Sequence, residues 1–168
     1  AVKYVIAQDG ISFEESVTSI TPQIEKVQLD NSNYVFHYSA VINNLLPNTI
    51  YNYCVGHDSI WSEWAQFKTA KAEEAPFTFV YWGDPQNDLK TFCSRIFREA
   101  FKKSPNADFW LFVGDLITAP MRDSLWYEYY YALGFIPTTI PFTMLPGNHE
   151  YPAVKIGDVT KRELTNLW

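Results

Sequence analysis

The period of the hydrophobic and polar positions changes near residue 70 of the chain. In the first part, Asn33–Ile42 alternates: Tyr34, Phe36 and Tyr38 fall on one face, and smaller side chains fall on the other. An alternation with a period of two predicts a half-buried β-strand. Farther along, short apolar runs alternate with stretches whose apolar positions recur every three or four residues, which predicts strands that alternate with helices. We therefore expect an all-β region followed by an α/β region.

We expect four or five strands in the first domain, placed at residues 1–70. The strands with clear bounds are Ala1–Gln8, Asn33–Ile42, Tyr51–Val55 and Trp61–Lys68. Tyr51 follows the turn Leu46-Pro47-Asn48-Thr49, so its hydroxyl can bond the loop backbone as in the tyrosine corner of β-sandwiches. A complete sandwich has about seven strands. We therefore expect an incomplete sandwich whose missing strands precede Ala1.

The second domain is placed at residues 77–168, after a short polar linker at residues 71–76. Its order is β-α-β-α-β, with strands at Phe77–Trp82, Phe109–Val113 and Ile140–Leu145 and helices at Asp88–Lys103 and Asp123–Leu133. Helical crossovers make such strands parallel neighbours. The almost continuous apolar run of the first strand predicts that both faces of the sheet are covered. Three strands and two helices amount to half of an α/β domain.

A polar turn that contains glycine follows each of the three strands. The turns are Gly83-Asp84-Pro85-Gln86, Gly114-Asp115 and Gly147-Asn148-His149-Glu150. The carboxyl ends of parallel strands meet at one edge of the sheet, where ligands bind. We therefore expect five side chains on one rim: Asp84, Gln86, Asp115, Asn148 and His149. Carboxylate, amide and imidazole groups of this kind hold divalent metal ions.

Composition and charge narrow the class of protein. The chain has 168 residues, of which 47% are hydrophobic, so it can build a core. Its net charge of −6, without a dense Lys/Arg patch, argues against nucleic-acid binding. No apolar run approaches the ~18 residues that a membrane span needs. Cys54 and Cys93 lie far apart without metal-site spacing, so we expect buried free thiols.

The three turns, in this order and with gaps of roughly thirty residues, resemble the first half of calcineurin-like metallophosphoesterases. A β-domain that ends in Leu-Pro-Asn-Thr-Ile-Tyr-Asn-Tyr and Trp-Ser-Glu-Trp-Ala-Gln-Phe-Lys-Thr is similar to the purple acid phosphatase branch, which carries a fibronectin type III-like N-terminal domain. The resemblance implies a phosphoester hydrolase in which a metal-bound hydroxide attacks phosphorus in line, at a centre of two divalent or trivalent ions (Fe, Zn, Mn or Mg). It also implies a small phosphoester as substrate and an exported protein: periplasmic, extracellular or lysosomal.

Carried over residue by residue, the resemblance implies roles for four side chains of the rim. Asp84, Asp115 and Asn148 would be metal ligands, with Asp115 as the bridge between the two ions. His149 would face the substrate as an acid or as a stabiliser of the transition state. Gln86 either binds a metal through its amide oxygen or holds a water, and the sequence leaves both alternatives open.

Two further departures from the family pattern limit this interpretation. Thr118 stands where the purple branch has a metal-binding Tyr, which argues against a purple ferric centre and favours Zn, Mn, Mg or ferrous iron. The three histidines are His37, His57 and His149, and none corresponds to the family's later Gly-His-x-His. Because imidazole supplies much of the affinity for transition metals, we expect this chain alone to be inactive. The alternative is a non-catalytic binding or scaffold module with a degenerate phosphatase half.

Overall fold

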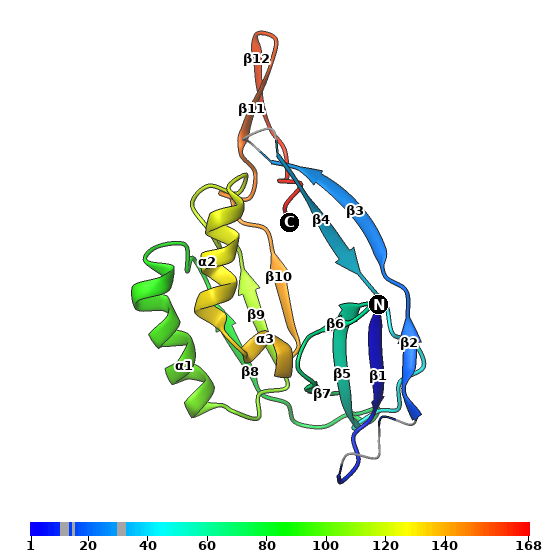
Figure 1. The fold of residues 1–168 in the computed structure, drawn as a ribbon. Helices are drawn as coiled ribbons and strands as arrows, with labels where there is room; N and C mark the ends of the chain where they lie inside the picture. The colour runs from blue at the N-terminus through cyan, green and yellow to red at the C-terminus, as the bar shows by residue number, and fades with distance from the viewer. Residues whose placement is uncertain (11–13, 15, 30–32) are drawn as a thin grey trace.

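The computed structural model describes residues 1–10, 14, 16–29 and 33–168. A mostly β region is followed by an α/β region, and the two lie side by side (Figure 1). The segment between them, residues 69–78, contains neither helix nor strand. The fold class predicted from the hydrophobic pattern is therefore confirmed.

The described part of the first region contains seven strands, in a five-stranded antiparallel sheet and a separate hairpin. The sheet has the order β2–β1–β5–β6, and β7 also pairs with β5, whereas β3 and β4 pair with each other. The bounds are β1 Val2–Ile6, β2 Thr18–Ile20, β3 Gln23–Gln28, β4 Tyr34–Ser39, β5 Ile50–His57, β6 Ile60–Trp61 and β7 Ala65–Lys68. The predicted count of four or five strands was wrong, because β2 is only three residues long and β3 is mostly polar.

The predicted tyrosine corner is present. Tyr51 is only 4% exposed, and its hydroxyl oxygen accepts a hydrogen bond from the backbone nitrogen of Leu46 at 2.9 Å. The Tyr51 ring also stacks on Phe67 of β7, with 5.6 Å between the ring centroids. This single side chain thus ties the loop before β5 to the sheet.

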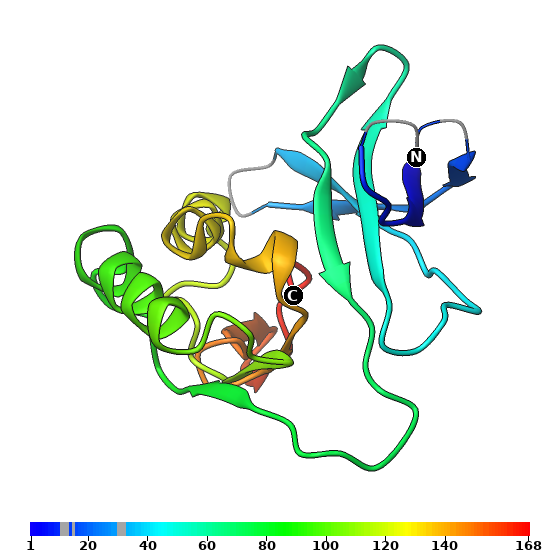
Figure 2. The same cartoon turned by 90° about the horizontal axis from the view of Figure 1, so that it is seen from below.

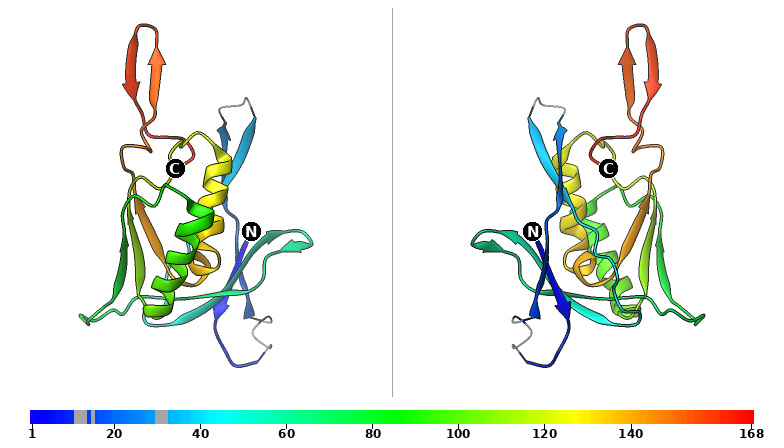
Figure 3. Two further views of the ribbon diagram at one scale, coloured as in Figure 1. Left: turned by 90° about the vertical axis from the view of Figure 1, so that its left-hand side faces the viewer. Right: turned by 90° about the vertical axis from the view of Figure 1, so that its right-hand side faces the viewer.

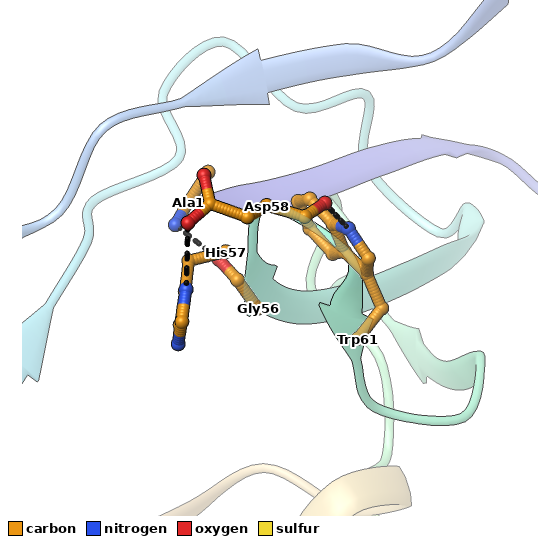
Figure 4. Close-up of polar contacts among 5 residues, drawn as sticks. All are labelled: Ala1, Gly56, His57, Asp58 and Trp61. Carbon is orange, nitrogen blue, oxygen red and sulfur yellow. Dashed lines mark hydrogen bonds and ion pairs between the residues drawn. The ribbon is translucent and has the colours of Figure 1, made fainter.

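The turn between β5 and β6 is closed by local polar contacts (Figure 4). The indole of Trp61 donates to the carbonyl oxygen of Asp58 at 3.0 Å, and the His57 ring lies 3.4 Å from the Asp58 carboxylate. Gly56 and Ala1 exchange backbone hydrogen bonds that extend the pairing of β1 with β5. His57 is exposed and belongs to this turn rather than to the rim of the second region.

The second region is built on a parallel sheet in the order β10–β9–β8. Its strands are β8 Phe79–Trp82, β9 Phe109–Val113 and β10 Phe142–Leu145. Trp82 pairs with Phe112, and Val113 pairs with Leu145, so the three carboxyl ends lie almost level. The predicted strands and their parallel arrangement are confirmed, although β8 and β10 each begin two residues later than expected.

Helices follow the predicted pattern with one local difference. The bounds are a π-helical segment Leu89–Cys93, α1 Ser94–Lys103, α2 Asp123–Leu133 and α3 Ile136–Thr139. Asp88, which precedes the π-helical segment, has a left-handed backbone, and its side chain makes no capping hydrogen bond. The Asp88 carbonyl instead accepts the backbone N–H groups of Thr91, Phe92 and Cys93. Gly134 follows the last residue of α2, with a φ of 62°.

Only one face of the parallel sheet is covered within the described part of the chain. Helices α1 and α2 pack on that face (Figure 3), where Trp82, Trp110 and Phe112 meet the buried Phe97. On the opposite face Phe79 is 46% exposed and Tyr81 is 63% exposed. The prediction that both faces are covered was therefore wrong: an apolar run identifies a strand but does not show what lies against it.

The two regions share contacts at two places. The Tyr53 hydroxyl of β5 donates to the carbonyl of Thr138 at 3.0 Å, where α3 lies beside β7 (Figure 2). The β3–β4 hairpin contributes Val27, 3% exposed, to the core of the α/β region, and Val35 packs against that core. A hairpin of β11 (Ala153–Ile156) and β12 (Val159–Arg162), which the sequence pattern did not predict, projects from this region before the chain returns to the core at Leu167 (Figure 1). Among the described residues, no helix is long and apolar enough to cross a membrane.

Candidate active site

The three polar turns lie against one another at the carboxyl edge of the sheet. The backbone nitrogen of Asp84 donates to the carbonyl of Gly114 at 3.3 Å. Gly114 has a φ of +96°, and a Cβ atom placed on it would lie 2.5 Å from the backbone of Gly147. Glycine is required here both for the backbone conformation and for the close approach. The prediction that these turns meet on one rim is thus supported by direct backbone contacts.

Glu150 holds the second and third turns together. Its side chain has no exposed surface. One carboxylate oxygen accepts the N–H groups of Asp115 and Gly147, both at 2.8 Å, and the other accepts that of Leu116 at 2.9 Å. Hydrogen bonds to a buried carboxylate compensate for its lost hydration. The sequence analysis assigned no role to this residue, although a carboxylate next to two sharp turns is a suitable acceptor for their free N–H groups.

The two predicted carboxylate ligands differ in exposure. Asp84 is exposed, whereas Asp115 is 7% exposed, and both have a left-handed backbone with a φ of 52°. Oδ1 of Asp115 accepts the backbone N–H of His149 at 2.9 Å. Within the described residues, neither Oδ2 of Asp115 nor the Asp84 carboxylate accepts a hydrogen bond. Three carboxylate oxygens are therefore open to a further partner.

The two predicted amide ligands are also available. Oε1 of Gln86 is buried and has no hydrogen-bond partner among the described residues. An orphaned buried oxygen is costly, so its position fits a bound cation or water. Asn148 is exposed, and its side-chain amide makes no hydrogen bond with the residues that the structure describes. Its backbone carbonyl accepts a hydrogen bond from Arg162 at 3.3 Å.

His149 is oriented by a backbone carbonyl. Its Nδ1 lies 3.1 Å from the carbonyl oxygen of Thr118. Since a carbonyl only accepts, Nδ1 carries the proton in this contact, and Nε2 is the ring nitrogen left for other chemistry. The Thr118 side chain is exposed and supplies no phenolate of the kind found at this position in the purple branch.

The donor set suits a cation that prefers oxygen. Two carboxylates and two amides are available, and the orphaned Gln86 oxygen supports their use as ligands. Among the described residues, no three His, Cys, Asp or Glu side chains gather in a way that could hold a metal ion. Oxygen donors without imidazole favour Mg²⁺ or Mn²⁺ over Zn²⁺ and bind more loosely than mixed sites.

A thiol fastens the first turn to the helix that follows it. The Cys93 thiol lies 3.2 Å from each of the carbonyl oxygens of Pro85 and Asn87, at the end of the π-helical segment. Burial, and secondarily the charge of Asp88, raise the pKa of Cys93. Burial likewise raises the pKa of Cys54, and both cysteines are free, as predicted. Cys93 is half-buried rather than fully buried, and it acts as a positioning group.

Beyond His149 the rim opens into a pocket of ≈ 440 Å³. Asn148, His149 and Thr118 line one side, and Arg122 and Arg162 line the pocket as well. Neither arginine was predicted as a site residue from the sequence, because neither lies in one of the three turns.

Comparison with known proteins agrees with this geometry. A family model described as calcineurin-like phosphoesterase matches residues 77–168. The chain belongs to the calcineurin-like phosphoesterase family. A second model, described as the N-terminal domain of purple acid phosphatase, matches residues 1–69. The resemblance inferred from the three turns and the tyrosine corner is thereby confirmed.

Individual relatives of this calcineurin-like chain are distant and much longer. A protein of Arabidopsis thaliana named probable inactive purple acid phosphatase 1 is 26% identical over 130 aligned residues, and the match covers 67% of this chain and 21% of that protein. The solved structure of a purple acid phosphatase from yellow lupin seeds matches with a TM-score of 0.67 and 18% identity, over 89% of this chain and 30% of the lupin chain. The structure of PhoD matches with a TM-score of 0.53 and 16% identity, over 89% and 32% of the two chains. The chain thus spans about a fifth of the curated relative and under a third of either solved protein, and these structures establish the fold alone.

Proposed function

We propose that this chain supplies part of the dinuclear centre of an exported, metal-dependent phosphoester hydrolase. The observation that carries the proposal is the convergence of the three turns, held by the contact of Gly114 with Gly147 and by the Glu150 carboxylate. Family membership supports phosphatase chemistry, and the open carboxylate and amide oxygens support cation binding.

In this proposal, Asp84, Asp115, Asn148 and Gln86 would hold the metals, with Asp115 as the shared ligand that the family resemblance implies. Metal ions at such a centre lower the pKa of water and offset charge on the phosphoryl oxygens. With its ring doubly protonated, His149 would present the Nε2–H group towards the substrate, where it would stabilise developing charge or give its proton to the leaving oxygen. The contact of Nδ1 with Thr118 fixes the ring orientation that this role requires.

We further propose that the chain by itself binds metal weakly and does not turn over substrate. Its predicted ligands comprise two carboxylates and two amides, without an imidazole. The alternative, a non-catalytic module, is kept because a relative is named probable inactive. The two proposals differ in whether the rim binds a metal through the predicted carboxylates.

Calorimetric titration of Mn²⁺ and Zn²⁺ into the 168-residue chain, with a p-nitrophenyl phosphate assay beside it, tests these proposals. We expect weak binding that Asp115→Asn weakens by at least about tenfold, because a ligand charge is lost. Asp158→Asn, an exposed carboxylate in the β11–β12 turn, is the matched control and should bind like the wild type.

Absence of binding to the wild type, or equal binding by Asp115→Asn, would contradict the metal-site proposal and favour the non-catalytic module. Robust turnover of p-nitrophenyl phosphate by the chain would instead contradict the expectation that it is inactive alone.

A further inference from the structure

The pocket beside His149 combines positive charge with an apolar floor. Pro120, Met121 and Pro152 supply apolar surface, and Arg122 and Arg162 supply the cations. Arg122 immediately precedes α2, and Arg162 ends β12, so two separate elements bring these side chains to one cavity. Because Asn148 and His149 belong both to the rim and to the pocket, the pocket is continuous with the candidate active site.

Neither guanidinium is neutralised by the described part of the chain. The two ion pairs found there join His57 with Asp58 and Lys102 with Glu99. Arg162 donates only from Nη1, to the carbonyls of Asn148 and Tyr151, both at 3.3 Å. Arg122 forms no side-chain hydrogen bond with any described residue. In a chain with a net charge of −6, two unpaired arginines in one pocket are a marked local excess of positive charge.

The chemistry of these groups indicates the kind of ligand. Guanidinium presents a planar fork of N–H donors that matches the paired oxygens of a phosphate or a carboxylate. Arg162 is also held in place by its two carbonyl contacts, so its remaining donors are pre-oriented at low entropic cost. The apolar floor accommodates the uncharged part of a small organic molecule.

We propose that Arg122 and Arg162 bind an anionic group of the substrate other than the phosphate that reacts. The pocket then selects phosphoesters that carry a second oxyanion, either another phosphate or a carboxylate. That the bound anion is part of a substrate rests on the proposed function, whereas the binding of an anion by this pocket does not.

The test measures anion binding without metal, on the 168-residue chain freed of metal ions by passage over a chelating resin, because dissolved EDTA is itself a polycarboxylate that could occupy the pocket. Sodium orthophosphate and sodium acetate are titrated separately at constant ionic strength, and backbone amide shifts are followed by NMR. We expect shifts centred on residues 118–122 and 148–152. Arg122→Gln should weaken binding by about tenfold or more, as expected when a charged hydrogen-bonding group is lost. Arg98→Gln, which removes the same charge from the exposed side of α1, should bind like the wild type.

Arg162→Gln should have a similar effect, and Arg162→Lys should restore part of the affinity because the charge returns without the fork. If Arg162→Gln disturbs the β11–β12 hairpin, as its amide spectrum would show, the Arg122→Gln result decides. The probe that binds more tightly identifies the second group as phosphate or carboxylate.

The proposal is overturned if neither anion shifts these amides, if Arg122→Gln binds as the wild type does, or if Arg98→Gln loses as much affinity. These outcomes leave the metal titration of the rim unaffected, so the failure of one proposal does not count as the failure of the other.

Discussion

The side chain of Glu150 holds two turns of the rim together through three hydrogen bonds. Its carboxylate is fully buried and accepts three backbone N–H groups from two turns. Each hydrogen bond to a charged group contributes about 1.5–3 kcal/mol, and an N–H group left without an acceptor costs a comparable amount. The position of Asp115 therefore depends on a residue that is not itself predicted to touch a metal.

Glu150→Gln should lower the free energy of unfolding by about 3 kcal/mol, because the amide keeps one acceptor and turns an NH₂ group towards backbone donors. Denaturant unfolding followed by circular dichroism measures the change. Glu163→Gln, an exposed glutamate in the same segment, is the matched control and should stay within about 0.5 kcal/mol of the wild type. Equal stability of the two variants would contradict the proposed role of Glu150.

The sequence could predict Asp84, Asp115 and Asn148 as neighbours, because each follows a strand and parallel strands end at a common edge. It could not assign Glu150 or Arg162 in the same way. Glu150 acts through hydrogen bonds to residues 34 and 35 positions away. Arg162 lies on a hairpin whose hydrophobic and polar positions follow no clear period. Such long-range polar contacts leave no local pattern.

At the level of elements, the rim depends on how closely two turns approach. Gly114 and Gly147 touch through their backbones, so side-chain volume at Gly114 must push β9 and β10 apart at their carboxyl ends. Gly157, in the β11–β12 turn, also has a positive φ, of +62°, but has nothing within 4 Å of a Cβ position. Substitutions at Gly114 and at Gly157 therefore separate the energetic cost of a left-handed backbone from the cost of the close contact between turns.

Gly157→Ala should cost about 1 kcal/mol, the price of a left-handed alanine. Gly114→Ala should cost at least about 2 kcal/mol more, because the new methyl group also displaces the neighbouring turn. Thermal unfolding of both variants measures the difference. Similar losses would show that the two turns can separate freely, and that their contact does not organise the rim.

Elements whose hydrophobic positions recur with a clear period were predicted well, and elements without such a period were missed. β9 and α2 have the bounds that their apolar patterns predict, Phe109–Val113 and Asp123–Leu133. β3 was missed because Val27 is its only buried residue. The covering of β8 was predicted wrongly because the same apolar run fits a sheet with one open face.

At the level of the whole molecule, the two regions are joined by more than a linker. Val27 lies in the same buried cluster as Trp126 and Leu167, so a strand of the first region completes the core of the second. The hydrogen bond from Tyr53 to Thr138 adds a polar contact near α3. A shared core makes the unfolding of the two regions cooperative.

Val27→Ala should lower the free energy of unfolding by about 2 kcal/mol, because it leaves a cavity in the shared core. Far-ultraviolet circular dichroism and tryptophan fluorescence should still give coincident transitions. Val41→Ala, which alters a side chain that is 73% exposed, should have little effect. Two separate transitions in the wild type would contradict a shared core.

The fastening of the three turns also has a mechanical consequence. Glu150 and the paired glycines lock the second and third turns into a single block, whereas Cys93 secures the first turn to its own helix. Beyond the ends of the strands, the described residues form one backbone hydrogen bond between these blocks, from the nitrogen of Asp84 to the carbonyl oxygen of Gly114 at 3.3 Å. A metal ion bound by both Asp84 and Asp115 would link these two blocks. Metal binding would then make this edge of the sheet more rigid, in addition to supporting catalysis.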